Sequence, residues 1–280
     1  MKISGSVGYT LLKRDNKYVL LLADVHDGVK YCEQDSVMID KFLNVKDNNN
    51  ILLEEVLREN FTLTDLWPGS LHTQRLKQLN VKNHKIKPID IRPMLLPFSW
   101  ELVGMNKMNQ DIILREYLAL LDNFFNYKST RFNNNYIVPE MKKSFDKKDL
   151  IIKHFNILKE KYNEFKKNNI KFMDTKILDI YKNNSDILET LNNITSSIME
   201  WYIVMLVHNS IKNTIIHIGL AHSEKVLILL TGPYRFEIVE NQGVNNMDNL
   251  RDTMRACIMV PPEINNLFNR KNYFHNKFGE

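Results

Sequence analysis

The stretch "YTLLKRDNKYVLLLADVH", residues 9–26, consists of two apolar runs on either side of Asp15 and Asn16. Asp and Asn favour tight turns, so the stretch predicts a hairpin over residues 8–25. The second strand of this hairpin ends in Asp24 and His26, where a buried strand would ordinarily end in a turn without ionisable groups. We therefore treat this strand end as one candidate edge of a functional site.

Other short apolar runs predict further strands, and each of them also ends in ionisable residues. These runs are "NILLEEVL" (50–57) with Glu54 and Glu55, "KIKPIDIRP" (85–93) with Asp90 and Arg92, and "NTIIHIGLAH" (213–222) with His222. A helix is predicted over residues 70–79, between the first two runs. Strands separated by helices favour a mostly parallel sheet, in which functional groups gather at the carboxyl ends of the strands. The sequence therefore predicts that residues far apart along the chain meet at one sheet edge.

Between about residue 108 and residue 209 the apolar residues follow helical spacing instead. The apolar residues of "DLIIKHFNILKEKYNEF" (149–165) fall near a 3.5-residue repeat, which favours helices packed side by side. They are Ile151, Phe155, Leu158, Tyr162 and Phe165. We predict one α/β domain over residues 1–280, with a central mostly parallel mixed sheet, an N-terminal hairpin and a large helical insertion at 108–209. The tail, which contains a Pro-Pro pair, is expected to be rich in loops.

Composition limits the classes of function. A chain of 280 residues with 44% hydrophobic and 25% charged residues is typical of a folded globular protein. The net charge of +5 comes from Lys-rich stretches that also contain acidic residues, so we expect no nucleic-acid partner. The sequence lacks both an apolar run of membrane-spanning length and a signal-peptide core, so we expect no membrane contact and a cytoplasmic location. We expect Cys32 and Cys257 to be reduced and structural.

The residue types at the predicted strand ends suit a divalent metal such as Mn, Co, Zn or Fe, which imidazoles and carboxylates bind. The candidate ligands are His26, His222, Asp24 and Asp90, with Asp27 beside them. An open coordination position would activate water, and Glu54 or Glu55 would act as the general base. Arg92 would orient an anionic group of the substrate, or would simply pair with Asp90. The alternative for the histidines is that they cap helices or belong to the core.

Two motifs near the ends of the chain resemble those of a known family. The sequences "ADVH" (23–26) and "GLAH" (219–222) are similar to the two Gly-x-x-His motifs of the TraB/Tiki family. That family belongs to a clan with Tiki proteases, the haem-uptake protein ChaN and erythromycin esterases, in which a helical segment separates the two halves of the sheet. The resemblance implies a pocket at the strand ends, His26 and His222 as paired histidines, and Glu54 or Glu55 as their acidic partner. Ala23 stands where the first motif of the family has Gly.

Two classes of function follow from these observations. The first is a metal-dependent hydrolase of TraB/Tiki type that cleaves an ester, amide or peptide bond in a small-molecule or peptide substrate. The second is a non-catalytic structural or partner-binding protein on the same scaffold, and a homo-oligomer is compatible with both. The heavy use of Asn, Lys and Ile is typical of AT-biased genomes, such as those of large DNA viruses. Haem binding would need an axial ligand, which the sequence does not identify.

Overall fold

The computed structural model describes residues 1–26, 29–33, 35–46, 48–56, 71–82, 85–97, 111–126, 141, 150–251 and 254–269. The chain divides into two compact units. The first, which we call the sheet unit, contains Met1–Glu55, Thr62–Pro88 and Ser210–Glu280. The second, which we call the helical unit, contains Val56–Phe61 and Ile89–Asn209.

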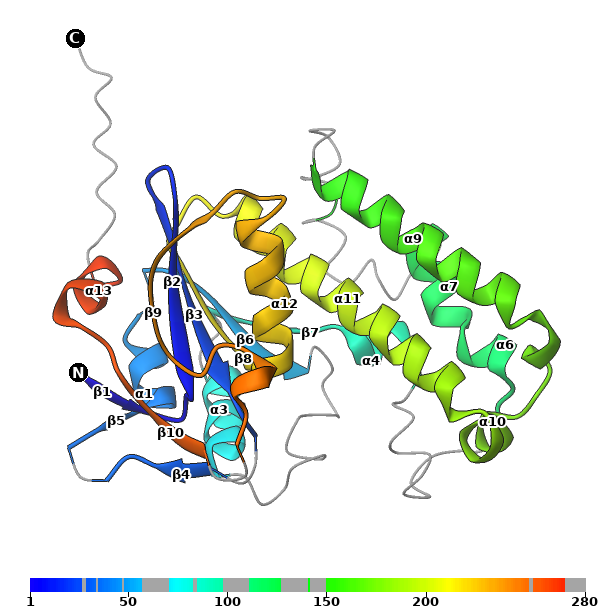
Figure 1. Cartoon of the computed structure of the whole chain (residues 1–280), viewed down its shortest axis with the longest axis horizontal. Helices are drawn as coiled ribbons and strands as arrows, with labels where there is room; N and C mark the ends of the chain where they lie inside the picture. The colour runs from blue at the N-terminus through cyan, green and yellow to red at the C-terminus, as the bar shows by residue number, and fades with distance from the viewer. Residues whose placement is uncertain are drawn as a thin grey trace, which may run out of the picture. The chain divides into compact units, whose positions relative to one another are not determined.

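Strands and helices of the described residues have the following bounds (Figure 1). The strands are β1 (Lys2–Ser4), β2 (Gly8–Arg14), β3 (Lys17–Asp24), β4 (Val29–Tyr31), β5 (Val37–Met38), β6 (Asn50–Val56), β7 (Ile86–Asp90), β8 (Thr214–Gly219), β9 (Glu237–Gly243) and β10 (Met254–Met259). The α-helices are α1 (Ile39–Asn44), α3 (Leu71–Lys82), α4 (Arg92–Leu95), α6 (Leu114–Tyr117), α7 (Ala119–Asn126), α9 (Leu150–Asn168), α10 (Ile177–Asn183), α11 (Ser185–Asn209), α12 (Leu220–Thr231) and α13 (Pro262–Leu267). Two short 3₁₀ helices are η1 (Ile170–Phe172) and η2 (Met247–Asn249).

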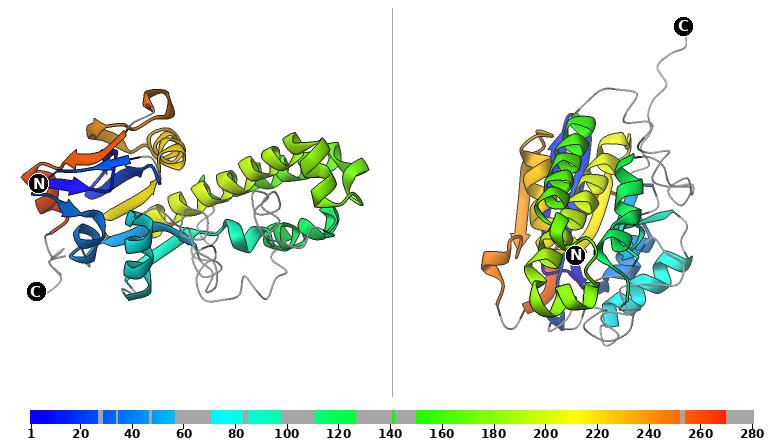
Figure 2. Two further views of the ribbon diagram at one scale, coloured as in Figure 1. Left: turned by 90° about the horizontal axis from the view of Figure 1, so that it is seen from below. Right: turned by 90° about the vertical axis from the view of Figure 1, so that its right-hand side faces the viewer.

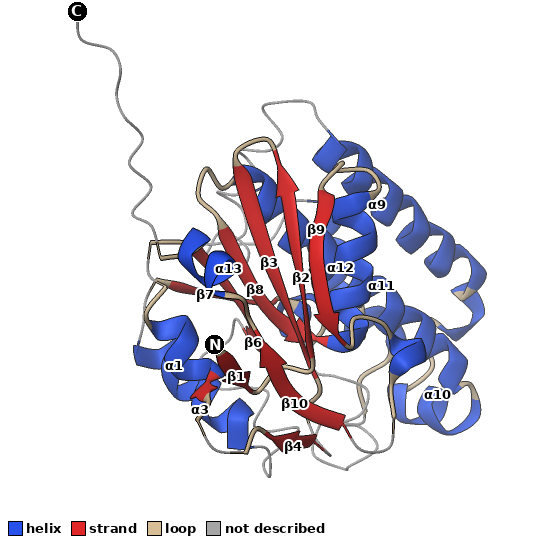
Figure 3. Ribbon diagram, turned by 60° about the vertical axis from the view of Figure 1, so that its left-hand side comes forward, coloured by secondary structure: helices blue, strands red, loops and turns tan. Residues whose placement is uncertain are grey.

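A six-stranded sheet with the order β7-β6-β8-β3-β2-β9 forms the centre of the sheet unit (Figure 3). Strands β6, β8 and β3 run parallel to one another, whereas β2 is antiparallel to both β3 and β9. The predicted α/β class, with a mixed, mostly parallel sheet and an N-terminal hairpin, is therefore confirmed. The parallel arrangement brings the carboxyl ends of β3, β6 and β8 to the same edge.

The N-terminal hairpin is formed by β2 and β3 and turns at the predicted pair of polar residues. Asp15 has a φ of 55°, in the left-handed region that Asp tolerates better than most residues. The register then places Arg14 opposite Lys17 and Gly8 opposite Ala23. This turn thus fixes which residue lies at the far end of β3, where Asp24 is the last residue.

Alternation along the strands decides what each face of the sheet covers. Leu20 and Leu22 of β3 pack with Ile51 and Leu53 of β6 in a core that also contains residues of α1, α3 and α13. Ala23, which alternates with Leu22, instead packs in a second cluster with Leu220 of α12. Helix α12 also contacts β3 and β8. Strands β3 and β8 are thus buried on both faces, as expected for parallel strands.

A second, four-stranded sheet with the order β4-β10-β1-β5 was not predicted from the sequence. Strand β10 of this sheet lies in the tail, as does helix α13. The expectation that the tail is rich in loops is therefore wrong. Within β10, Met254, Ala256 and Ile258 are buried, which explains why the segment is a strand.

The two cysteines are joined to each other in the sheet unit, so the expectation that they are reduced is wrong. Cys32 follows β4 and Cys257 lies in β10, and their Cα atoms are 5.0 Å apart although 225 positions separate them in sequence. Parallel pairing of β4 with β10 brings Tyr31 opposite Ala256. The neighbouring cysteines are thereby placed within bonding reach.

Helices α7, α9 and α11 form an aromatic core in the helical unit. The two longer helices, α9 and α11, lie side by side and are coloured green and yellow-green in Figure 2. The five apolar residues of α9 that predicted this packing are all buried. Phe155 lies 5.1 Å from Trp201, measured between ring centroids, and the Trp201 indole N–H donates to the Ile151 carbonyl at 3.0 Å. The Trp201 hydrogen bond satisfies the polar atom of an otherwise apolar cluster.

Helix α11 has 25 residues and is the longest in the described part of the chain. Its second half is almost wholly buried, as the apolar run around Trp201 predicts. Within the described ranges, however, none of the helices combines the length and the apolar content needed to span a membrane.

Candidate functional site

The candidate site lies at the carboxyl ends of β3, β6 and β8 in the sheet unit. Register pairing places Asp24 of β3 beside Gly219 of β8. Leu53 of β6 pairs with His217 of β8, so Glu54 follows the last registered pair of these two strands. The strand-end rule therefore correctly predicts that Asp24 and Glu54 belong to one edge.

Asp24 holds the imidazole of His26. The Asp24 Oδ2 atom lies 2.9 Å from His26 Nδ1, and the Asp24 side chain is only 1% exposed. An ionised carboxylate can only accept, so Nδ1 carries the hydrogen of this bond. In a neutral imidazole this tautomer leaves the lone pair on Nε2, the atom that faces away from Asp24.

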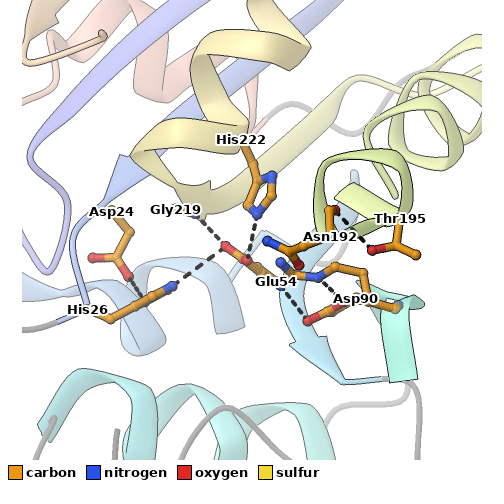
Figure 4. A network of polar contacts seen from close by, with 9 residues as sticks. Asp24, His26, Glu54, Asp90, Asn192, Thr195, Gly219 and His222 are labelled. Atoms are coloured by element: carbon orange, nitrogen blue, oxygen red, sulfur yellow. Dashed lines mark hydrogen bonds and ion pairs between the residues drawn. The ribbon is translucent and has the colours of Figure 1, made fainter. Parts of the chain in front are cut away.

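Glu54 occupies the centre of the site, as Figure 4 shows. Its side chain is 3% exposed, and Oε2 lies 3.8 Å from Nε2 of His26. Its other oxygen, Oε1, lies 3.9 Å from Nε2 of His222. Both separations exceed the length of a direct hydrogen bond. One buried carboxylate thus faces an imidazole nitrogen of each of the two motifs.

His222 reaches Glu54 from the first turn of α12, not from a strand end as the sequence suggested. Strand β8 ends at Gly219, and α12 begins at Leu220 with no loop between them. The sequence interpretation extended the strand across "GLAH" because its residues are apolar up to the histidine. The helical turn places the His222 imidazole, 17% exposed, over the carboxylate.

Gly219 is a site residue whose role was not predicted. Its N–H donates to Glu54 Oε2 at 2.5 Å, so the carboxylate accepts an N–H at the start of α12. Helix N-termini favour negative charge, and the first turn of α12 has no acidic residue of its own. A Cβ at position 219 would lie 3.1 Å from Glu54 Oε2 and 3.3 Å from His26 Nε2. Only glycine therefore leaves the space between these two atoms unfilled.

Glu55 is buried but lies on the other face of β6. It is 2% exposed, and alternation along the strand directs it to the side opposite Glu54. The choice between the two glutamates, which the sequence left open, is thus made by the strand. Glu54 is the carboxylate that faces His26 and His222.

Asp90 and Arg92, both in the helical unit, pair with each other. Nε and Nη2 of Arg92 each lie 2.8 Å from an oxygen of Asp90, and the Arg92 backbone N–H also donates to Asp90 at 3.1 Å. Asp90 is 3% exposed, so this bidentate bond compensates a buried charge. Pairing between the two was one of the alternatives for Arg92 in the sequence.

His217, Asp27 and Cys32 are close in sequence to residues of the site. His217 is 2% exposed and bonds the Gly5 carbonyl through Nε2 at 3.1 Å, so it is a histidine of the core. Asp27 lies outside the described residues. Cys32 is held in its disulfide with Cys257 and is therefore unavailable as a thiolate ligand.

The side chains of the site are of the types that bind divalent metals, but the distances between their nitrogen and oxygen atoms are longer than those between ligands of one metal ion. Two imidazole nitrogens and a carboxylate are suitable ligands, and Asp24 supplies the outer carboxylate that orients a ligating histidine. Among the described residues, no three His, Cys, Asp or Glu side chains converge closely enough to hold a metal as they stand. Ligands of one tetrahedral ion lie about 3.4 Å apart. The 3.8 Å and 3.9 Å separations would therefore have to shorten by a few tenths of an ångström, and the two imidazoles, which face different oxygens of Glu54, would have to turn toward the same ion.

Comparisons with known proteins add no relative. No protein-family model, no curated protein and no solved structure matches the chain significantly. The resemblance to the TraB/Tiki family therefore stays a prediction that depends on the two motifs.

Proposed function

We propose that the chain is a hydrolase of TraB/Tiki type whose reacting groups are Glu54, His26 and His222. One observation carries this proposal: the buried Glu54 carboxylate faces Nε2 of both motif histidines, at 3.8 Å and 3.9 Å. The two histidines are about 200 positions apart in sequence. A buried carboxylate beside two imidazoles combines a general base with two candidate metal ligands.

Two hydrogen-bond acceptors, one from His26 and one from Glu54, face each other in the site, which favours a catalytic role over a stabilising one. With its hydrogen on Nδ1, a neutral His26 presents a lone pair to Glu54 Oε2, which is also an acceptor. Two acceptors that face each other repel unless a proton or a cation lies between them. Burying Glu54 at 3% exposure increases this cost. A protein gains little stability from such a group, whereas a site that moves protons requires one.

A divalent cation is part of the proposal because the donor set suits it. His26 Nε2, His222 Nε2 and the Glu54 carboxylate would hold it, and Asp24 would fix the orientation of His26. When bound, such an ion lowers the pKa of a coordinated water toward neutrality and polarises a carbonyl group.

Side chains of the protein then carry out the proton transfers. Glu54 accepts a proton from the attacking water, because it is the carboxylate oriented by the Gly219 N–H. Glu54 then passes this proton to the leaving group of an ester, amide or peptide, while His222 would act as a metal ligand through the Nε2 atom that faces the carboxylate. Asp24 keeps His26 in one tautomer throughout.

Calorimetric titration with Mn²⁺, Co²⁺ and Zn²⁺, on full-length chain purified without chelators, tests the proposal together with assays on chromogenic esters, amides and peptides. We expect one saturable metal site and hydrolysis of at least one bond class. Glu54→Gln, His26→Gln and His222→Gln should each weaken metal binding by about tenfold or more. His154→Gln, in α9 of the helical unit, should leave it unchanged.

Equal metal binding by the wild type and all three site variants would contradict the cofactor assignment. If metal binds at this site but no ester, amide or peptide is hydrolysed, the non-catalytic scaffold is the better account. The His154→Gln control separates loss of the site from a general effect of removing a histidine.

The cytoplasmic location expected from the sequence stays a prediction, and the cysteines offer a direct test of it. Disulfides are rare in reducing compartments, so Cys32–Cys257 argues against the cytoplasm. Alkylation of thiols in intact cells before lysis, followed by mass spectrometry, distinguishes the two states. Alkylated cysteines support the cytoplasm, and a protected disulfide contradicts it.

A further inference from the structure

A pocket lies at the opposite end of the sheet unit from Glu54. It has a volume of about 470 Å³ and is lined by Lys13, Arg14, Asp15, Arg235 and Glu237. These residues come from the hairpin turn between β2 and β3 and from the turn that precedes β9. Because β3 rises about 3.3 Å per residue, this end of the strand is roughly 23 Å from Asp24. The pocket is therefore separate from the candidate active site.

Positive charge dominates the pocket. Three cations and two carboxylates line it, and the Lys17 ammonium lies close enough to Arg14 to be affected by its charge. The two carboxylates are exposed, and the Asp15 side chain, at 88% exposure, lies 3.9 Å from Arg14. Solvent therefore weakens the compensation that the carboxylates provide. The lining holds one more cation than carboxylates, and Lys17 adds a further cation beside Arg14.

Arg14 is held in place before any ligand arrives. Its Nη1 donates to the Tyr234 carbonyl at 3.0 Å, and its guanidinium lies 4.8 Å from the centroid of the Phe236 ring. Lys17 is anchored in the same way, since its Nζ donates to the Ser210 carbonyl at 3.0 Å. Cations that are already ordered lose little conformational entropy on binding an anion.

Burial and, to a lesser degree, neighbouring positive charge disfavour the charged form of Lys17. Burial, together with the charge of Arg14, lowers the pKa of Lys17 to about 8. In the described part of the chain, the Arg235 guanidinium has no hydrogen bond or ion pair. An anion among Arg14, Arg235 and Lys13 would offset the repulsion and give the Arg235 guanidinium a partner.

We propose that this pocket binds a small phosphorylated molecule. A phosphate monoester carries close to two negative charges near neutral pH, which matches the excess of cations. Guanidinium groups bind phosphate oxygens in a bidentate manner. The pocket of about 470 Å³ falls in the range of small-molecule sites and leaves room for an organic part beside the phosphate. This inference is independent of the function proposed for Glu54.

Calorimetric titration of the full-length chain with glucose 6-phosphate, and separately with inorganic phosphate, tests the proposal at constant ionic strength. We expect saturable binding, with loss of about tenfold or more in affinity in Arg235→Gln and in Lys13→Gln, because each removes a charged contact. Tighter binding of the sugar phosphate indicates that the organic part is recognised, and equal binding indicates that free phosphate is the ligand.

A matched variant provides the control. Arg255→Gln removes the same charge from an exposed side chain of β10 in the other sheet, and should leave the affinity unchanged. An equal loss in Arg255→Gln would show that only the net charge of the protein matters, which overturns the proposal. Absence of saturable binding by the wild type to either probe at about 10 mM also overturns it. Thermal unfolding of each variant without ligand shows that the fold is intact.

Discussion

The Glu54 carboxylate accepts a hydrogen bond from the Gly219 N–H, and this contact joins the carboxyl ends of β6 and β8. The same oxygen lies 3.8 Å from His26, while the other oxygen lies 3.9 Å from His222. Gly219 thus orients the carboxylate so that each of its oxygens faces one motif histidine. The Glu54 side chain therefore connects the two motifs, which neither motif does alone.

The adjacent glutamates of β6 permit a matched comparison. Glu54→Gln keeps the shape of the side chain but removes its charge, so we expect metal affinity and any hydrolysis to fall by about tenfold or more. Glu55→Gln makes the same change on the opposite face of the strand and should leave both unchanged. Calorimetry and activity assays on the two variants check the assignment. An equal loss in both would mean that the face of the strand does not matter.

Gly219→Ala tests whether the space between Glu54 and His26 is needed. The φ of Gly219 is −54°, so alanine meets no backbone strain, and its Cβ would instead lie 3.1 Å from Glu54 Oε2. We expect the free energy of unfolding to fall by about 1–3 kcal/mol. The affinity for metal should fall by a proportionally larger amount. Urea unfolding and calorimetry on the same preparation measure the two effects. Wild-type metal affinity in Gly219→Ala would show that this space has no role.

Local patterns in the sequence were sufficient to predict strands of the central sheet and the buried face of a helix in the helical unit. The apolar runs around Asp15 and Asn16 predicted β2 and β3, and the spacing of residues such as Phe155 and Tyr162 predicted the buried face of α9. In both cases one periodicity extends over the whole element, so neighbouring residues are sufficient to identify it.

The site could be predicted only in part, because its decisive features depend on long-range geometry. The sequence could not choose between Glu54 and Glu55, since adjacent residues differ only in the face of the strand they occupy. It placed His222 on a strand because α12 begins at Leu220, directly after β8, without a loop. It also missed the bond between Cys32 and Cys257, because β4 and β10 are short and distant in sequence.

Reduction of Cys32–Cys257 should lower the stability of the sheet unit. The bond closes a loop across 225 positions of sequence, so its loss restores chain entropy to the unfolded state. We expect the free energy of unfolding to fall by about 2–5 kcal/mol in the presence of dithiothreitol. Urea titrations with and without the reductant measure this. The double variant Cys32→Ser/Cys257→Ser should be insensitive to the reductant, and a wild type that is equally insensitive would contradict the bond.

Lys46 should make stability depend on pH in the alkaline range. It is 2% exposed, its Nζ donates to Asn265 at 2.6 Å and also to Asn269, and burial lowers its pKa to about 8. Between about pH 8 and about pH 10.5 the unfolded chain therefore binds more protons at this group than the folded protein does.

The sign follows directly: relative to Lys46→Met, the unfolding free energy of the wild type should rise with pH across this window. The slope for one group is at most about 1.4 kcal/mol per pH unit, and it vanishes below the window. Chemical unfolding of both proteins at several pH values measures the difference. A difference that falls with pH would mean that the charged form of Lys46 is favoured by folding.

Anomalous scattering from crystals grown with Zn²⁺ or Co²⁺ tests the central claim most directly. If His26, Glu54 and His222 form one site, an anomalous peak should lie about 2.0–2.2 Å from Nε2 of both histidines and from a Glu54 oxygen. At the same metal concentration this peak should be diminished in crystals of Glu54→Gln and unchanged in those of Glu55→Gln. Metal-loaded crystals with no peak between the two histidines, or with an undiminished peak in Glu54→Gln, would contradict the account.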